Sequence, residues 1–398
     1  MQHLYHILSL DGGGVRALSS LIILKHFMDA LIIRLEQTSA EPISRRPCDH
    51  FDLICGSGTG GILALFLGRL RMTTEEAIEA YTFLAEQTFL IQKWRPALLL
   101  LGIRWLAVSL WPCIVLALWI SYFRVTADEA FHLLPIVADC VFQALQERSM
   151  PLFEGDRLAD LLQRIVHDRE EDKNASFKLL KGPKTLILAS TDCIADAPPR
   201  RFRSYDTSTH AADYAPMWAV ARASCATPRL FSPMIINKEP LIDAGICGYP
   251  NPTEVALDEA AAIWPTSQIG SVLSIGTGRQ PIVSLTGTWS TISRTCLKLI
   301  ESSSIIDDRL LQRFGAIFPQ VYFRFDVDRG LTQEWMDVHG PDGIAGITAA
   351  YLRFASSGLR MKDCVARHCG GDDPIVSSIG TLNCQVRGRS HIDHCRVN

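Results

Sequence analysis

The stretch LYHILSLDGGGVR, at residues 4–16, joins an apolar run to an acidic residue and three glycines. This order predicts a buried strand that enters a tight turn. Residues 17–37 then have helical character. The same order returns at residues 51–70, where FDLIC precedes a second glycine cluster and a helix-like apolar pattern. Strand, glycine turn and helix in repetition predict an α/β layer fold with a mostly parallel sheet.

Later segments continue this alternation. Residues 184–190 (KTLILAS) and 270–276 (GSVLSIG) have strand character. Residues 73–76 (TTEE) have the types that cap the start of a helix. Residues 155–166 predict another helix, because several leucines and an isoleucine share one of its faces. That face consists of Leu158, Leu161, Leu162 and Ile165.

The composition favours a large folded core. The chain has 398 residues, of which 48% are hydrophobic and 20% charged, so general disorder is excluded. A net charge of −3 excludes a nucleic-acid partner held by a basic surface. The first ten residues lack a basic region and a long apolar run, so we expect no secretory signal. We therefore expect an intracellular protein, cytoplasmic or membrane-associated, whose twelve cysteines are reduced thiols.

An uncharged segment begins at Trp105 and ends at Phe123, with Arg104 and Arg124 on either side. Its length is in the range of about 17–25 residues that a membrane-spanning helix requires. Pro112, near its middle, would kink a helix. Three hypotheses remain open: a membrane-spanning or re-entrant segment, a lipid-facing cap near an active site, and a buried core helix. Contact with a membrane surface through this segment is thus one expectation.

The sequence beyond about residue 353 is polar and predicts an irregular C-terminal tail, residues 353–398. Its cysteines and histidines raise the alternative of a zinc site. Their spacing fits no strong zinc pattern such as paired C-x₂-C, so a loose tail with reduced thiols is favoured. The residues concerned are Cys364, His368, Cys369, Cys384, His391, His394 and Cys395.

The first glycine cluster is a candidate anion site. Gly12, Gly13 and Gly14 allow successive backbone N–H groups to turn toward one point, and the following helix adds its positive end. Such a turn can hold a phosphate or a developing oxyanion. A nucleotide-binding loop is the alternative, but a G-x-G-x-x-G pattern would require glycine where Ala17 stands.

The second cluster, Cys55-Gly56-Ser57-Gly58-Thr59-Gly60-Gly61, has the outline of a nucleophile elbow, G-x-S-x-G. The frame with glycine at both ends runs from Gly56 to Gly60, and its centre is Gly58. A frame centred on Ser57 has Cys55 and Thr59 at the glycine positions and fails twice. The pattern therefore predicts an elbow with no hydroxyl at its apex.

The third site is Leu241-Ile242-Asp243-Ala244-Gly245, an apolar run that ends in an acidic residue and two small ones. A turn aspartate that bonds its own backbone is the simpler interpretation. A general base is the alternative.

Together these sites resemble the patatin-like phospholipase family, in particular its fungal-type members, from about residue 4 to residue 352. SLDGGGVRALSSLIIL resembles the oxyanion block of that family, and FDLICGSGTGGILALFLGRLRMT resembles the block usually written G-T-S-T-G-G. Asp243 stands where the family has the aspartate of D-G-G/A. Further ordered matches are FRSY at 202–205, ARAS at 221–224 with Pro228, NP at 251–252, SIGTG at 274–278 and YFRFDVDRGL at 322–331.

The resemblance implies a three-layer α/β/α fold over residues 1–352 and a lipid or phospholipid acyl ester as substrate, with no cofactor and no metal. It implies a Ser-Asp dyad in which Asp243 is the base, and an oxyanion hole at Gly12, Gly13, Gly14 and Arg16. Gly58 stands where the family has its serine. The apolar residues 96–123 form an insertion outside the family pattern.

Two functional hypotheses follow from the missing serine. In the first, the protein is a lipid acyl hydrolase whose activity is impaired, with Ser57, Thr59 or a water activated by Asp243 as substitute. Ser57 is one residue from the apex, so we expect its side chain to point away from Asp243, and Thr59 has the same defect. In the second, the protein is a catalytically inactive pseudoenzyme that binds lipid or a protein partner.

Overall fold

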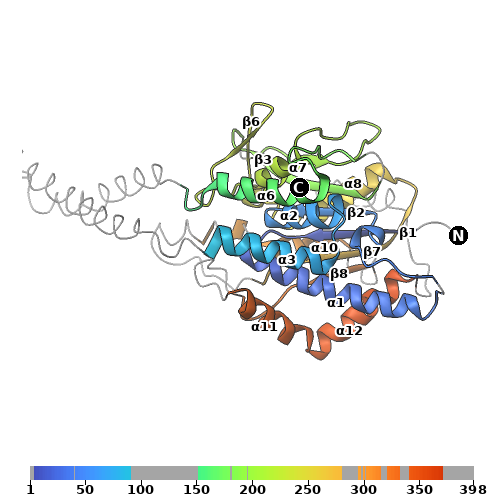
Figure 1. Ribbon diagram of the computed structural model, residues 1–398. Helices are drawn as coiled ribbons and strands as arrows, with labels where there is room; N and C mark the ends of the chain where they lie inside the picture. The colour runs from blue at the N-terminus through green and yellow to red at the C-terminus, as the bar shows by residue number, and fades with distance from the viewer. Residues whose placement is uncertain are drawn as a thin grey trace, which may run out of the picture.

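The central sheet organises the chain (Figure 1). The computed structural model describes residues 4–39, 41–90, 151–179, 182–194, 196–279, 295–296, 299–300, 302–314, 321–331 and 340–370. Within these residues the sheet has eight strands. They are β1 (Leu4–Leu10), β2 (Leu53–Ser57), β3 (Lys184–Thr191), β4 (Arg200–Arg203), β5 (Met234–Ile236), β6 (Glu239–Ile242), β7 (Gln268–Ile275) and β8 (Tyr322–Phe325).

The strand order is β5-β6-β3-β2-β1-β7-β8, with β4 paired to β3. Strands β3, β2, β1, β7 and β8 run parallel to one another. The short strands β4, β5 and β6 pair antiparallel at one side. The predicted α/β fold with a mostly parallel sheet is confirmed.

Both faces of the sheet are buried. Ile7 and Leu53 lie in one hydrophobic cluster, and their neighbours Leu8 and Ile54 lie in the other. Successive side chains of a strand point to opposite faces, so a strand between two helical layers requires apolar residues at every position. This is why the central strands are continuous apolar runs.

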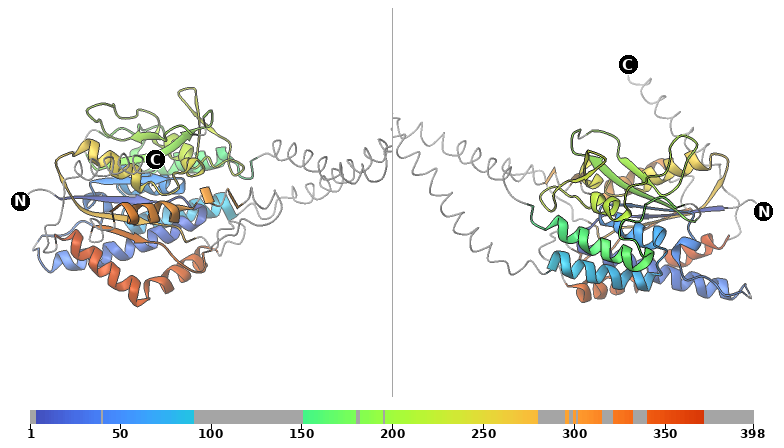
Figure 2. Two further views of the ribbon diagram at one scale, coloured as in Figure 1. Left: turned by 180° about the vertical axis from the view of Figure 1, so that it is seen from behind. Right: turned by 45° about the horizontal axis from the view of Figure 1, so that its top comes forward.

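The helices form two layers, one on each face (Figures 1 and 2). One cluster contains residues of α1, α2, α3, α6, α7, α11 and α12, and the other contains residues of α8 and α10. The helices are α1 (Ala17–Glu36), α2 (Thr59–Ala64), α3 (Thr74–Ala85), α6 (Gly155–Glu170), α7 (Met217–Ser224), α8 (Thr253–Ile263), α10 (Ser303–Phe314), α11 (Pro341–Leu352) and α12 (Ala355–His368). The three-layer arrangement expected from the sequence is therefore present.

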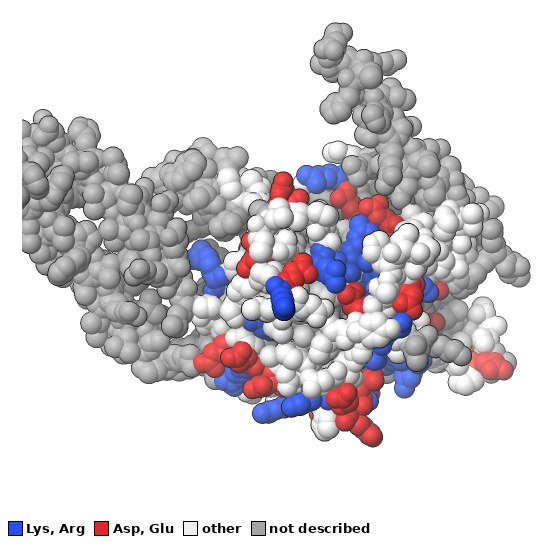
Figure 3. Space-filling view, turned by 90° about the horizontal axis from the view of Figure 1, so that it is seen from above, with Lys and Arg blue, Asp and Glu red and all other residues white. Residues whose placement is uncertain are grey.

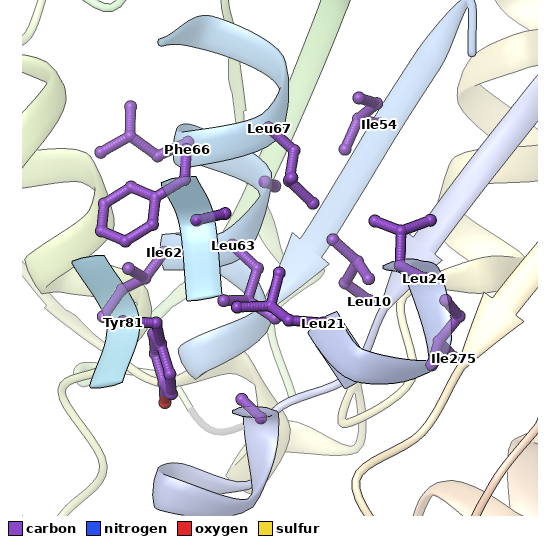
Figure 4. Close-up of a cluster of buried hydrophobic side chains, with 14 of the residues drawn as sticks. Leu10, Leu21, Leu24, Ile54, Ile62, Leu63, Phe66, Leu67, Tyr81 and Ile275 are labelled. Atoms are coloured by element: carbon purple, nitrogen blue, oxygen red, sulfur yellow. The ribbon is translucent and has the colours of Figure 1, made fainter. Parts of the chain in front are cut away.

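The helices after the two glycine turns share one core with the strands before them (Figure 4). Leu21 of α1 and Leu63 of α2 are buried in the same cluster as Leu10 and Ile54. Full burial of such a side chain contributes about 1.5–3 kcal/mol. This packing holds the two turns next to each other at the ends of β1 and β2.

The predicted cap of α3 is confirmed. The Thr73 hydroxyl accepts a hydrogen bond from the Glu76 N–H at 3.3 Å, and the Glu76 carboxylate accepts one from the Thr73 N–H at 2.8 Å. This capping box satisfies two N–H groups that a helix start leaves unpaired.

Two boundaries around the second turn differ from the sequence prediction. β2 covers residues 53–57 rather than 51–55, because β1 and β3 both pair with it through Gly56. The helix expected at residues 59–70 ends as α2 at Ala64, and a π-helical turn, Leu65–Arg69, follows.

The prediction of an irregular tail is wrong for residues 355–368, which form α12. Met361, Cys364, Val365 and His368 are buried, at the spacing of one helical face. Ser357 is buried as well, so three of the five buried residues are a serine, a cysteine and a histidine, and the apolar periodicity of this face is weak. The rest of the tail, residues 371–398, lies outside the described residues, as do Cys384, His391, His394 and Cys395.

The segment from Trp105 to Phe123 also lies outside the described residues, and so does the whole insertion at 96–123. Among the helices that the structure does describe, none combines the length and the apolar character needed to cross a membrane.

The described surface seen in Figure 3 carries Lys and Arg side chains interspersed with Asp and Glu.

Candidate active site

The two glycine turns touch each other. A Cβ atom added at Gly12 would lie 3.1 Å from the Ser57 carbonyl oxygen and 3.3 Å from the Gly58 Cα. This contact is tighter than most side chains tolerate, so the close approach favours glycine at position 12. The ends of β1 and β2 thus bring together two of the three sites that the sequence singled out.

The second turn has the sharp backbone of an elbow. Gly58 has φ +56° and ψ −132°, a conformation that residues with a side chain adopt only under strain. A Cβ atom at Gly56 would collide with the carbonyl of Gly60, and a Cβ atom at Gly60 would collide with the carbonyls of Leu10 and Asp11. Glycine at position 56 therefore lets β2 approach α2, and glycine at position 60 lets α2 approach the end of β1.

Asp243 faces the apex of this turn. A Cβ atom at Gly58 would lie 3.3 Å from Asp243 Oδ2 and 3.4 Å from Oδ1. A side chain at position 58 would therefore start in contact with the carboxylate. Gly58 itself is buried, whereas Asp243 is partly exposed.

The Asp243 carboxylate is held on both oxygens. The Thr227 hydroxyl donates to Oδ2 at 2.6 Å, and the Gly245 N–H donates to Oδ1 at 2.8 Å. The residue as a whole is partly exposed, but burial of its carboxylate raises the pKa of Asp243 above its usual range, against these two hydrogen bonds, which lower it. The carboxylate is a stronger base than an exposed aspartate, as a general base requires.

Neither hydroxyl beside the apex is bonded to Asp243. Ser57 is the last residue of β2, and its buried Oγ makes no hydrogen bond. Thr59 Oγ1 accepts hydrogen bonds from the N–H groups of Gly13 and Gly14, at 3.0 and 3.1 Å. Of the two residues considered as substitute nucleophiles, Ser57 thus makes no hydrogen bond and Thr59 is bonded to the first glycine turn.

The N–H groups and the carbonyls of the first turn have separate partners. The N–H groups of Gly13 and Gly14 converge on one oxygen, that of Thr59. The carbonyls accept hydrogen bonds from three different side chains. The Thr277 hydroxyl donates to the Gly12 carbonyl at 2.9 Å, Arg16 Nε to the Gly13 carbonyl at 3.2 Å, and the Tyr81 hydroxyl to the Gly14 carbonyl at 2.7 Å. The Gly12 N–H donates to the Pro250 carbonyl at 3.4 Å. Two convergent N–H groups are what an oxyanion requires.

A buried ion pair lies directly before this turn. Asp11, at the end of β1, is fully buried and receives two hydrogen bonds from Arg324 of β8, at 3.0 and 2.6 Å. Arg324 also donates to Asp326 at 2.9 Å. Burial raises the pKa of Asp11 to about 6, although the charge of Arg324 lowers it. Arg324 thereby anchors the strand end from which the glycine turn starts.

Two side chains of this site, Tyr81 and Thr227, carried no signal in the sequence. Thr277 and Arg324 lie within the ordered matches SIGTG and YFRFDVDRGL, but those matches gave neither residue a role. In the described part of the chain, no group of three or more His, Cys, Asp or Glu residues is arranged to hold a metal ion.

The matching family model and three similar proteins all bear the names of phospholipases. The family model of patatin-like phospholipases matches residues 8–257, which contain all three glycine sites and Asp243. Phospholipase A I of Arabidopsis thaliana is 26% identical over 358 residues, covering 80% of this chain and 24% of that protein. Calcium-independent phospholipase A2-gamma of Mus musculus is 24% identical over 328 residues, covering 80% and 34%.

A shorter match is closer in sequence. The cGAMP-activated phospholipase of Pseudomonas aeruginosa is 43% identical over 63 residues, 16% of this chain and 15% of that protein. The chain spans about a quarter to a third of the length of the two longer relatives.

Proposed function

The chain belongs to the patatin-like phospholipase family, and on this premise we propose that it binds a lipid acyl ester at the glycine turns, with hydrolysis strongly impaired by the absence of a hydroxyl at Gly58. Family membership supports lipid acyl hydrolase chemistry. The observation that carries the proposal is the position of Asp243, whose carboxylate lies 3.3 Å from the place where a Gly58 Cβ would stand.

In this proposal the N–H groups of Gly13 and Gly14 form the oxyanion hole. The Thr59 hydroxyl, which now accepts both hydrogen bonds, turns aside and the acyl carbonyl oxygen takes its position. Arg16 acts on this hole indirectly, because its side chain holds the Gly13 carbonyl away from the acyl oxygen. Gly56 and Gly60 allow the sharp elbow, and Gly12 allows the close contact of the two turns.

The cost of the missing serine is large. Removal of the nucleophile from a serine hydrolase lowers kcat by about 10⁶-fold, and the oxyanion hole and substrate binding retain about 10³–10⁴-fold over water. A water activated by Asp243 could attack the ester with the help of this remaining rate enhancement. We expect slow hydrolysis, and a phospholipid acyl ester as substrate, since the longer relatives bear the names of phospholipases A. Contact with a membrane surface through the segment from Trp105 to Phe123 stays a prediction, as does a cytoplasmic or membrane-associated location.

The second candidate is a pseudoenzyme that binds lipid or a protein partner without turnover. It is favoured by the same combination of a retained oxyanion turn and an apex that carries no hydroxyl. The two candidates differ in whether the remaining groups are still competent for chemistry.

Restoring the nucleophile separates them. Hydrolysis of p-nitrophenyl butyrate and of phosphatidylcholine vesicles is measured for the wild type and for Gly58→Ser, with Gly58→Ala as the matched control that adds Cβ without a hydroxyl. We expect Gly58→Ser to raise kcat by about 10³-fold or more, and Gly58→Ala to give no gain. Adding Asp243→Asn to Gly58→Ser should abolish the gain.

If a folded Gly58→Ser protein that still binds the vesicles gains nothing, the hydrolase proposal fails and the pseudoenzyme stands. If neither protein binds vesicles nor hydrolyses either ester, the lipid-binding proposal fails as well.

A further inference from the structure

The hydroxyl that contacts Asp243 belongs to Thr227, sixteen residues earlier in the chain. We propose that Thr227 is the substitute nucleophile of this site and that Asp243 is its base. This inference rests on the proposed function, because it requires an acyl ester bound at the glycine turns. It assigns the residual hydrolysis to a named side chain rather than to water.

The pair is fixed by several contacts. Thr227 lies in the turn after α7, where its own N–H donates to the Cys225 carbonyl at 2.8 Å. The Asp243 N–H donates to the Ala226 carbonyl at 3.2 Å, which ties the end of β6 to this turn. The side-chain hydrogen bond of 2.6 Å completes the pair. The Gly245 N–H on the other carboxylate oxygen orients the base. A nucleophile within hydrogen-bond reach of an oriented base is the arrangement that covalent catalysis requires.

The same carboxylate oxygen serves both positions. Asp243 Oδ2 accepts the Thr227 hydrogen bond, and Oδ2 is also the oxygen nearest to the position of a Gly58 Cβ. Thr227 Oγ1 and the apex at Gly58 therefore lie on two sides of the same atom, Asp243 Oδ2. Thr227 and Asp243 are partly exposed and Gly58 is buried, so an ester can reach Thr227 more readily than the floor of the elbow.

The other nucleophilic groups around the elbow either bond to other partners or are buried without one. Ser224 Oγ and the Cys225 thiol both contact the Gly58 carbonyl, at 3.1 and 3.2 Å. Burial raises the pKa of the Cys225 thiol well above its usual range, which suppresses the reactive thiolate. Ser57 Oγ is buried and makes no hydrogen bond, and Thr59 Oγ1 accepts the N–H groups of Gly13 and Gly14. Of the hydroxyl and thiol groups that the structure describes around Gly58, only Thr227 has a hydrogen bond to Asp243.

The reaction proceeds in two steps. Thr227 Oγ1 forms a bond to the acyl carbon while its proton passes to Asp243 Oδ2, and the tetrahedral intermediate expels the lipid alkoxide, which takes that proton from Asp243. Asp243 then accepts a proton from a water that attacks the acyl-threonine. The bond from the acyl carbon to Thr227 Oγ1 breaks, the proton returns to that oxygen, and the fatty acid leaves. One ester and one water give one acid and one alcohol.

The test combines covalent labelling with kinetics. Full-length wild type, Thr227→Val, Thr227→Ser, Asp243→Asn and Gly58→Ser are treated with a biotinylated alkyl fluorophosphonate, and the modified peptide is identified by mass spectrometry. Thr38→Val is the matched control, because Thr38 is exposed at the far end of α1. Hydrolysis of p-nitrophenyl butyrate is measured in parallel.

We expect a label on Thr227 in the wild type and in Thr38→Val, and a label on residue 227 in Thr227→Ser. We expect Thr227→Val and Asp243→Asn to lose the label and to hydrolyse the ester about tenfold more slowly or worse. A wild type that stays unlabelled while Gly58→Ser is labelled at residue 58 overturns the role of Thr227 and leaves the proposed function intact. Unaltered hydrolysis in Thr227→Val overturns it as well. If no variant is labelled, the proposed function fails together with this inference.

Discussion

Replacing Arg324 with methionine tests whether the buried ion pair supports the glycine turn. Arg324 donates to both oxygens of Asp11 and to one oxygen of Asp326, and it is 5% exposed. Methionine fills similar space without charge, so two carboxylates remain in one buried cluster with no cation between them. Breaking a buried pair in this way costs about 3–5 kcal/mol of the free energy of unfolding.

The loss should depend on pH in a defined direction. Burial raises the pKa of Asp11 to about 6 in the folded protein, above its ordinary value of 3.8, even while Arg324 lowers it. Without Arg324 this pKa rises further. A group with a raised folded pKa contributes stability that is complete below its unfolded pKa and is lost as the pH rises through the folded pKa. The deficit of Arg324→Met is therefore largest near pH 8 and smaller near pH 5.

The assay is urea unfolding, followed by tryptophan fluorescence, at these two pH values. Arg329→Met serves as control, because Arg329 is exposed on the same connection after β8. Its effect should stay within about 0.5 kcal/mol at both pH values. An Arg324→Met deficit below about 1 kcal/mol, or one equal at both pH values, would refute this account of the Asp11 pair.

Three further predictions concern the site and its surroundings. Gly58→Ala should lower the free energy of unfolding by about 1–3 kcal/mol, since its Cβ would lie 3.1 Å from Gly12 Cα at a positive φ; urea unfolding with no loss would contradict the elbow geometry. Tyr81→Phe removes the hydroxyl that donates to the Gly14 carbonyl and should cost about 1–3 kcal/mol, with a lower kcat in the Gly58→Ser background; unchanged stability would count against the anchoring role. Burial, with His6 and His50 nearby, lowers the pKa of His368 well below 6.5, so its contribution to the free energy of unfolding is present above pH 6.5 and is lost as the pH falls. The wild type should therefore lose more stability than His368→Gln between about pH 7 and pH 5, and equal losses in the two proteins would refute this prediction.

Much of the fold was predictable because its signals are local. β1 has the bounds expected from LYHILSL, and α1 covers residues 17–36 of the expected 17–37. An apolar run between two layers and a glycine turn after it need no information from distant residues. β2 was displaced by two residues, because pairing with β1 and β3 carries the strand through Gly56. α12 was missed because the apolar periodicity of its buried face is weak and depends on the packing of Cys364 and His368.

The sequence by itself determined that position 58 has no hydroxyl and that three glycine sites follow strands, because both are properties of consecutive residues. Only the tertiary structure decided which hydroxyl contacts Asp243. Ser57 ends a strand with its Oγ buried and unbonded, and Thr59 accepts the two glycine N–H groups. Thr227 reaches Asp243 because the turn after α7 packs against the end of β6. A hydrogen bond of 2.6 Å between such segments depends on how the layers pack, and no pattern of neighbouring residues encodes that distance.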